Sequence, residues 1–167
     1  VLETARDICA CLRQAGVRVE LDDSDQSAGW KFNQWEMKGV PIRLEVGPRD
    51  MEQRQVVLVR RDDHEKVVVP MDGLACAVKE MLADIQRAMH DKALAMREEK
   101  TVDARTFAEL EQGVNGGFAR AMWCGERACE DAIKQKTGGA TVRCKPFEQH
   151  KLGGACVAEA NWIEVIA

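Results

Sequence analysis

The sequence predicts an α/β protein of two domains: a mixed sheet with flanking helices over residues 1–100, then a small α/β domain over residues 101–167. In the first domain, apolar residues at helical spacing alternate with short β-branched runs, a pattern typical of layered α/β folds. A charged stretch, Arg97 to Lys100, ends a long helical pattern and marks the boundary. The composition, 46% apolar and 31% charged, is that of a globular chain.

The first fifty residues predict helices and short strands in alternation. Apolar residues recur at helical spacing from Leu2 to Leu12, and Gly16 suits the left-handed position that follows a helix. The next expected elements are a strand at Val17–Leu21, a helix at Ser27–Lys38 ended by Gly39, a strand at Ile42–Val46 and a turn at Gly47-Pro48.

A hairpin and a long helix are expected next. Gln55–Arg60 and Lys66–Pro70 predict paired strands around Asp62-Asp63. The helix should run from about Gly73 to Glu98, with Asp72 as its candidate cap. Its core-facing stripe is Leu74, Val78, Met81, Leu82, Ile85 and Met89. The second domain predicts a helix at Thr106–Ala121, a cysteine-bearing segment at Trp123–Thr137, and strands at Thr141–Cys144 and Trp162–Ile166.

Composition also narrows the classes of function. No apolar run approaches the ~18–20 residues of a membrane helix, and the sequence shows no secretory leader. Seven cysteines, an odd number without such a leader, predict a reducing, cytoplasmic compartment. The net charge of −4 provides no broad positive field, so any RNA binding should depend on a local surface.

One such surface is predicted within Gly29–Asp50, which contains two tryptophans, one phenylalanine, four basic and three acidic residues. Aromatic rings stack on unpaired bases, carboxylates accept from the N1 and N2 groups of guanine, and arginine donates to its O6 and N7 atoms. Arg43 and Glu45 share a strand face because they lie two residues apart. The alternatives are core packing for the rings and a surface ion-pair network for the charges.

Four stretches carry a resemblance to a known family: LDDSDQSAGWKFNQWEMKGVPIRLEVGPRD at 21–50, VVLVRRDDHEK at 56–66, CG-x-x-x-CE at 124–130 and RCKPFEQ at 143–149. Together they resemble the anticodon-binding and C-terminal domains of prolyl-tRNA synthetases of the archaeal and eukaryotic-like type. The resemblance implies that Phe32 stacks on the two guanines of the proline anticodon, that Glu36 and Asp50 accept from them, and that Arg43 and Arg49 donate. Arg49 stands where some members carry lysine. Trp30 and Trp35 are then expected to have packing roles.

The cysteines leave two interpretations open. Spacing alone fits either scattered buried thiols or a zinc site, which favours four ligands in a tetrahedron. The resemblance places three ligands at Cys124, Cys129 and Cys156, with the fourth position at Glu159 or, if its loop moved, at Cys144. We expect this domain to keep its fold without metal, with zinc as the alternative.

For the whole protein, the resemblance implies a ligase that joins proline to its tRNA using ATP and magnesium. The catalytic domain, and a first strand of the anticodon-binding domain, would lie upstream, and the protein would form a homodimer through the catalytic domain. No catalytic residue is expected in this chain. Two rivals remain: a free-standing RNA- or protein-interaction module, and a thiol enzyme that would need one of the histidines, 64, 90 or 150, beside a cysteine.

Overall fold

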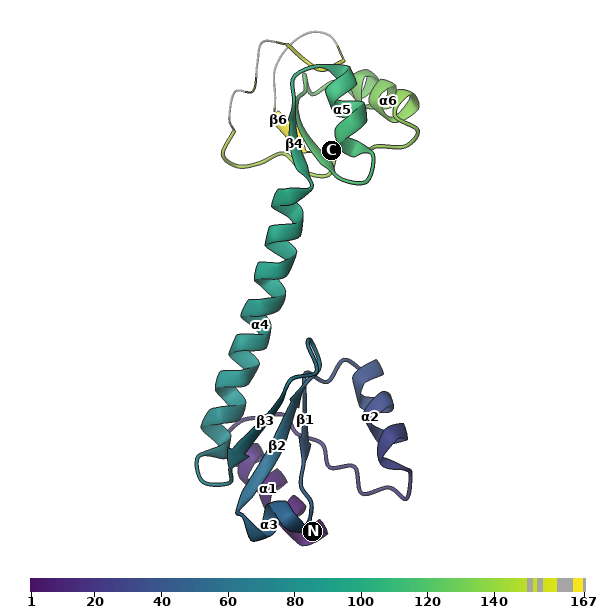
Figure 1. Cartoon of the computed structure of the whole chain (residues 1–167). Coiled ribbons are helices and arrows are strands. Elements are labelled where there is room, and N and C mark those ends of the chain that lie inside the picture. The colour runs from purple at the N-terminus through teal and green to yellow at the C-terminus, as the bar shows by residue number, and fades with distance from the viewer. Residues whose placement is uncertain (150–151, 153–154, 159–163, 167) are drawn as a thin grey trace. The chain divides into compact units, whose positions relative to one another are not determined.

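The computed structural model describes residues 1–149, 152, 155–158 and 164–166, and it divides into two compact units, residues 1–91 and 92–167. Each unit has its own sheet (Figure 1), and each has its own hydrophobic core. Helices and strands alternate along both, which confirms the predicted α/β class. The division falls within the long helix, whereas the sequence places the domain boundary at the end of that helix.

The first unit combines helices with an antiparallel sheet (Figure 1). Its strands are β1 (Ile42–Glu45), β2 (Gln55–Arg60) and β3 (Lys66–Pro70), in the order β1-β2-β3. The helices are α1 (Leu2–Gln14), α2 (Ala28–Met37), α3 (Pro48–Glu52) and the start of α4 (Leu74–Glu99). Helices α1 and α4 pack on one face of the sheet, and α2 contacts Arg43 on the other face (Figure 1). Val56 and Leu58 on the central strand are fully buried against Leu12, Leu74 and Val78. Ile42 and Leu44 of β1 pack against this core, which positions the strand that carries the candidate site.

Two predicted elements of this unit differ from the structure. Val17–Leu21 is not a strand, although Val17 and Val19 pack against the core and Arg13 donates to the Val19 carbonyl at 3.1 Å. The alternating valines therefore pack one side of this segment against the core, but the segment forms no strand with a neighbour. Pro48 opens the short helix α3 in place of a simple turn, because proline suits the first helical position.

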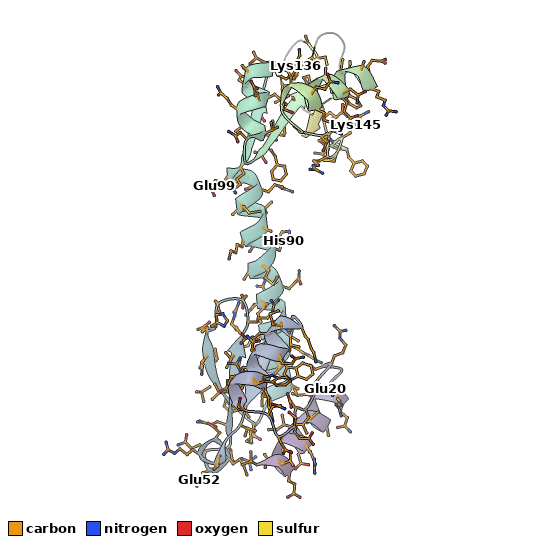
Figure 2. The ribbon with its side chains drawn as sticks, turned by 90° about the vertical axis from the view of Figure 1, so that its right-hand side faces the viewer. Glu20, Glu52, His90, Glu99, Lys136 and Lys145 are labelled. Atoms are coloured by element: carbon orange, nitrogen blue, oxygen red, sulfur yellow. The ribbon has the colours of Figure 1, made fainter. Side chains whose placement is uncertain are left out.

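The core stripe of α4 is shorter than the sequence predicts. Leu74, Val78 and Ile85 are buried, whereas Met89 is 47% exposed. His90, which follows it, is also exposed (Figure 2). The carboxylate of Asp72, the candidate cap, accepts a hydrogen bond from Arg54 at 3.2 Å. Among the described residues, no helix combines the length and hydropathy needed to cross a membrane.

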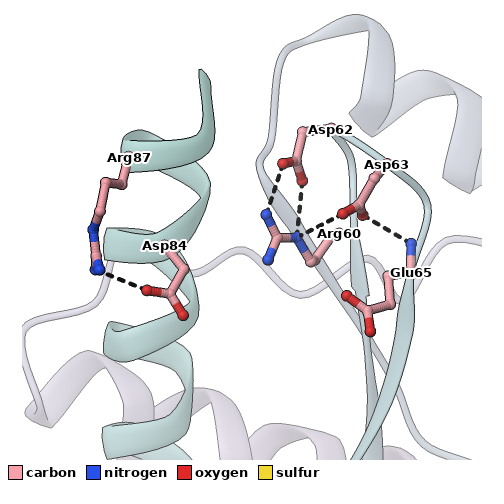
Figure 3. A network of polar contacts seen from close by, with 6 residues as sticks. All are labelled: Arg60, Asp62, Asp63, Glu65, Asp84 and Arg87. Carbon is pink, nitrogen blue, oxygen red and sulfur yellow. Dashed lines mark hydrogen bonds and ion pairs between the residues drawn. The ribbon is translucent and has the colours of Figure 1, made fainter. Parts of the chain in front are cut away.

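The β2–β3 turn is organised by Arg60 (Figure 3). Its guanidinium donates to Asp62 at 2.7 and 3.1 Å and lies 3.4 Å from Asp63, whose other oxygen accepts from the Glu65 backbone N–H at 3.0 Å. The hydrogen bond from Arg60 lowers the pKa of the Asp62 carboxyl. Arg61 donates its backbone N–H to the Pro41 carbonyl at 3.0 Å, which joins this turn to the start of β1.

The second unit has a sheet of three strands with mixed directions. Its elements are β4 (Thr101–Ala104), α5 (Phe107–Val114), β5 (Phe118–Met122), α6 (Arg127–Lys136) and β6 (Glu164–Ile166). β5 is central, parallel to β4 and antiparallel to β6. Small residues on β4 and β5, namely Ala104, Ala119 and Ala121, allow Leu110 and Ile133 to pack closely on the sheet.

Sequence periodicity misplaces several elements of the second unit. The helix predicted at Thr106–Ala121 ends at Val114, because Gly116 takes a left-handed φ of 89° and the chain then enters β5. β4 was not predicted, and Thr141–Cys144 contains only an isolated bridge at Cys144 where a strand was expected. Of the strand predicted at Trp162–Ile166, β6 accounts for residues 164–166, and Trp162 lies outside the described residues.

Candidate nucleic-acid interface

Helix α2 and strand β1 bring three of the predicted site residues together. The Ser27 hydroxyl accepts from the Trp30 backbone N–H at 3.4 Å and so begins α2, and Gly39, with φ 81°, ends it. Phe32 and Glu36 are four residues apart and therefore share one face of the helix. The connection through Pro41 then directs the chain into β1, which carries Arg43.

Arg43 lies at the centre of a compact group formed with Phe32, Glu36 and Glu45, here called the Arg43 cluster. Its Nη1 donates to Glu36 Oε1 at 2.6 Å, and its Nε donates to Glu45 Oε1 at 2.8 Å. The guanidinium carbon lies 3.9 Å from the centroid of the Phe32 ring, a cation–π contact. The side chains of Arg43, Glu36 and Glu45 are 20%, 33% and 28% exposed, so the group is partly shielded but open to a ligand.

The other two predicted residues lie on α3, outside this cluster. Asp50 accepts from the Gly47 backbone N–H at 2.9 Å and so caps the start of α3, and its second oxygen lies 3.5 Å from Gln55 Nε2. Arg49 is exposed, and no ion pair joins it to another residue in the described part of the chain. The five predicted residues therefore form two groups, one around Arg43 and one on α3.

Sequence reasoning left two contributors out of the site. Glu45 is one, and its two-residue spacing from Arg43 was the available signal. Asp22 is the other: its carboxylate accepts from the Trp35 indole at 2.7 Å and lies 3.7 Å from Lys31 Nζ. Hydrogen bonds from the Ser24 side chain and then from Trp35 lower the pKa of Asp22 to about 2. Trp35 therefore ties α2 to the segment before it, while Trp30 is half exposed.

Three cysteines meet in the second unit. The sulfur atoms of Cys124, Cys129 and Cys156 all lie within 4.8 Å of one another. Burial opposes the Cys124 thiolate, but hydrogen bonds from the Glu126 backbone and the other two thiols outweigh it and lower the pKa. The hydrogen bond with Cys124 raises the pKa of Cys129 to about 12. Cys144 is exposed and is not in this group, and Glu159 lies outside the described residues.

Comparison with known proteins matches each unit to a domain model. Residues 1–81 match the family model "Anticodon binding domain", and residues 107–161 match "Prolyl-tRNA synthetase, C-terminal". The chain is 50% identical to the proline–tRNA ligase of Ruminiclostridium cellulolyticum and 52% identical to that of Alkaliphilus oremlandii. These alignments cover 94% and 93% of the chain and 33% of each relative. A third proline–tRNA ligase, from Clostridium botulinum, is 49% identical over 94% of the chain and 33% of its own length.

The chain thus carries an anticodon-binding domain followed by a prolyl-tRNA synthetase C-terminal domain, and about half of its residues are identical to those of proline–tRNA ligases over most of its length. It spans about a third of the length of the curated relatives it matches. The anticodon-binding match contains the Arg43 cluster and α3, and the match to the prolyl-tRNA synthetase C-terminal domain contains the three clustered cysteines. The two groups of candidate residues therefore lie in two separately matched domains.

Proposed function

We propose that the Arg43 cluster reads a guanine of the proline anticodon, as the RNA-recognition part of a proline–tRNA ligase. One observation carries the proposal: inside a region matched to an anticodon-binding domain, a guanidinium lies 3.9 Å from a phenylalanine ring and 2.6 Å from a carboxylate. A flat donor, an acceptor and a ring in contact are the groups that recognise the edge and face of one unpaired base.

The cluster keeps the hydrogen-bonding capacity that base recognition needs. A guanidinium has five N–H donors, and the contacts with Glu36 and Glu45 use two of them. Nη1 and Nη2 keep donors for the O6 and N7 atoms of guanine. Glu36 bonds Arg43 through Oε1, so its second oxygen is positioned to accept from the N1 and N2 groups of the same base. Phe32 contacts Arg43 with its ring and supplies the stacking surface.

Helix α3 is the proposed second part of the anticodon site. The exposed guanidinium of Arg49 supplies a donor for a guanine, and its planar fork suits two parallel hydrogen bonds better than lysine does. Asp50 already accepts one hydrogen bond from Gly47, and a carboxylate has further lone pairs with which to accept from guanine. Asp50 thus both holds α3 and contributes to the site.

The activity of the whole enzyme also belongs to this proposal. The parent protein attaches proline to its tRNA with ATP and magnesium, and its catalytic domain, outside this chain, forms the homodimer. Domains 1–100 and 101–167 then have different tasks: the first binds the anticodon, and the second docks on the catalytic domain. This reading favours a cytoplasmic location, where tRNA is charged.

For the second domain, the thiol cluster supports a zinc site at Cys124, Cys129 and Cys156, against the metal-free domain that the sequence favours. Zinc prefers thiolate ligands in a tetrahedron with zinc–sulfur distances of about 2.3 Å. Three sulfur atoms within 4.8 Å of one another fit three corners of such a site. A bound zinc would cross-link the segments that carry these cysteines and so stabilise the domain.

Direct RNA binding tests the proposed anticodon function. The 167-residue chain would be titrated against a labelled stem-loop with the proline anticodon, and against loops in which either guanine is replaced by adenine. Each replacement should weaken binding by about 1–3 kcal/mol if a base edge is read. Equal affinity for all three RNAs would contradict anticodon reading and favour a module that binds RNA by charge alone. No binding to any of them would favour a protein-interaction module.

A further inference from the structure

We infer that Glu45 is a positioning residue that sets guanine specificity by fixing which edge of Arg43 faces the RNA. This inference rests on the proposed function. The geometry that points to it is the bond from Arg43 Nε to Glu45 Oε1 at 2.8 Å, made by a different nitrogen from the Nη1 that bonds Glu36.

The bond with Glu45 leaves Arg43 only one way to make a two-bond contact with a base. A guanidinium can present either its side, through Nε and Nη2, or its end, through Nη1 and Nη2. Because Glu45 occupies the Nε–H, only the end remains for a pair of acceptors such as guanine O6 and N7. Glu45 therefore selects the orientation without touching the base.

Glu45 also lies on the better packed of the two elements whose carboxylates hold Arg43. It lies on β1, opposite Val57 of the central strand, and the neighbouring residues of that strand form the core. Glu36 lies on α2, a helix without any buried residue. Glu45 thus anchors Arg43 to the sheet, whereas Glu36 lies on a helix that is only partly buried.

The loss of Glu45 should consequently affect both base contacts. With its Nε–H released, Arg43 can turn to make a bidentate pair with Glu36, which is the preferred geometry between arginine and a carboxylate. That pair would occupy the second oxygen of Glu36 and the end of the Arg43 fork together. The site would keep its charges but lose its preference for guanine.

Four variants of the full chain separate this role from general electrostatics. Glu45→Ala removes the acceptor, Glu45→Gln keeps an acceptor oxygen at the same reach, and Glu45→Asp keeps the charge but withdraws it by one methylene. The control is Glu52→Ala, an exposed glutamate on α3 (Figure 2). The measured quantity is the ratio of Kd for the adenine-substituted loop to Kd for the guanine loop, alongside the thermal midpoint.

The order of the variants decides the outcome. We expect the ratio to fall by about tenfold in Glu45→Ala and Glu45→Asp, the discrimination that one bidentate base contact typically gives. Glu45→Gln should retain most of the wild-type ratio, and Glu52→Ala all of it. If instead Glu45→Asp keeps the wild-type ratio and Glu45→Gln loses it as Glu45→Ala does, Glu45 acts through its charge alone and the positioning role is overturned.

Other results overturn the inference in distinguishable ways. An equal loss of affinity for guanine and adenine loops in Glu45→Ala, or no loss at all, removes Glu45 from specificity while leaving the proposed function intact. A wild-type ratio near one removes the proposed function itself. If Glu45→Ala fails to fold, the comparison of Glu45→Gln with Glu45→Asp, which both keep a polar group at this position, still decides between the two orders.

Discussion

The Trp35 indole donates a hydrogen bond to the Asp22 carboxylate at 2.7 Å, and this joins helix α2 to the segment that precedes it. Lys31, on the same helix, lies 3.7 Å from that carboxylate. α2 buries none of its residues, so these polar contacts, with the contact between Glu36 and Arg43, hold it in place. Asp22 therefore supports the proposed RNA site through α2, although it lies outside the Arg43 cluster.

The attachment of α2 should depend on pH only in strong acid. The pKa of Asp22 is lowered from 3.8 to about 2 by the folded structure. Because the folded pKa is the lower one, the stabilising contribution is fully present above about pH 4 and is lost as the pH falls toward 2. The indole N–H signal of Trp35, followed by NMR, should shift in that window. Asp22→Asn should abolish this shift, and Asp25→Asn on the same segment should not.

Glu36→Ala should weaken binding to the proline anticodon loop by about 1–3 kcal/mol, because it removes an acceptor from the base edge. Anisotropy titrations with guanine and inosine loops would measure this loss. Inosine lacks the N2 amino group, so the variant should bind both loops alike, whereas the wild type should prefer guanine. A variant that still prefers guanine would assign the N2 contact to another residue.

Arg49→Ala should reduce RNA affinity without lowering the melting temperature, because this side chain is exposed. Arg49→Lys tests the kind of contact. If Arg49 bonds a guanine through its fork, lysine should restore only part of the affinity, since it lacks the planar pair of donors. Full recovery by lysine, with a salt dependence equal to that of the wild type, would instead indicate a phosphate contact.

Protein purified without chelators should contain zinc, measured by plasma mass spectrometry, if the thiol cluster is a metal site. Cys124→Ser should lose the metal, because it removes one thiolate ligand of the proposed site. Cys76→Ser, at an exposed cysteine on α4, is the matched control. A metal-free wild-type protein with the native fold would restore the interpretation of three packed thiols.

Gly117→Ala should destabilise the second unit by about 1–3 kcal/mol, the usual cost of overpacking. A Cβ at this position would meet the Lys100 carbonyl oxygen at 2.5 Å, where backbone cannot yield easily. Gly29→Ala, in a helix with nothing within 4 Å of the added methyl group, is the control. Urea denaturation of both variants would measure the difference, and an unchanged midpoint for Gly117→Ala would show that β4 and β5 can separate at little cost.

The sequence was most informative where local physics decides the structure. Ser27 and Gly39 set the limits of α2, and the alternating valines of β2 and β3 predicted their hairpin. It was least informative where the structure of a segment depends on residues far away in the sequence. Val17–Leu21 alternates like a strand but pairs with no other strand, and the helix expected to reach Ala121 ends at Val114, after which the chain forms β5 and pairs with β4.

The candidate site shows the same division. The family resemblance pointed to Phe32, Glu36 and Arg43, and the structure places the other two in contact with Arg43. The capping role of Asp50 depends on α3, which the sequence reasoning took for a turn. The bond between Asp22 and Trp35 joins residues thirteen positions apart across an irregular segment, so no periodic pattern signalled it.

The bond network around Arg43 would also affect the entropy of the proposed RNA binding. A free arginine side chain loses roughly 1.5–2 kcal/mol of rotamer freedom when it is fixed in one conformation. In this chain the two carboxylates and the phenylalanine ring order Arg43 during folding, before any RNA arrives. A guanine would then meet a preorganised donor, and the ordering cost of complex formation would fall mainly on the nucleotides of the loop.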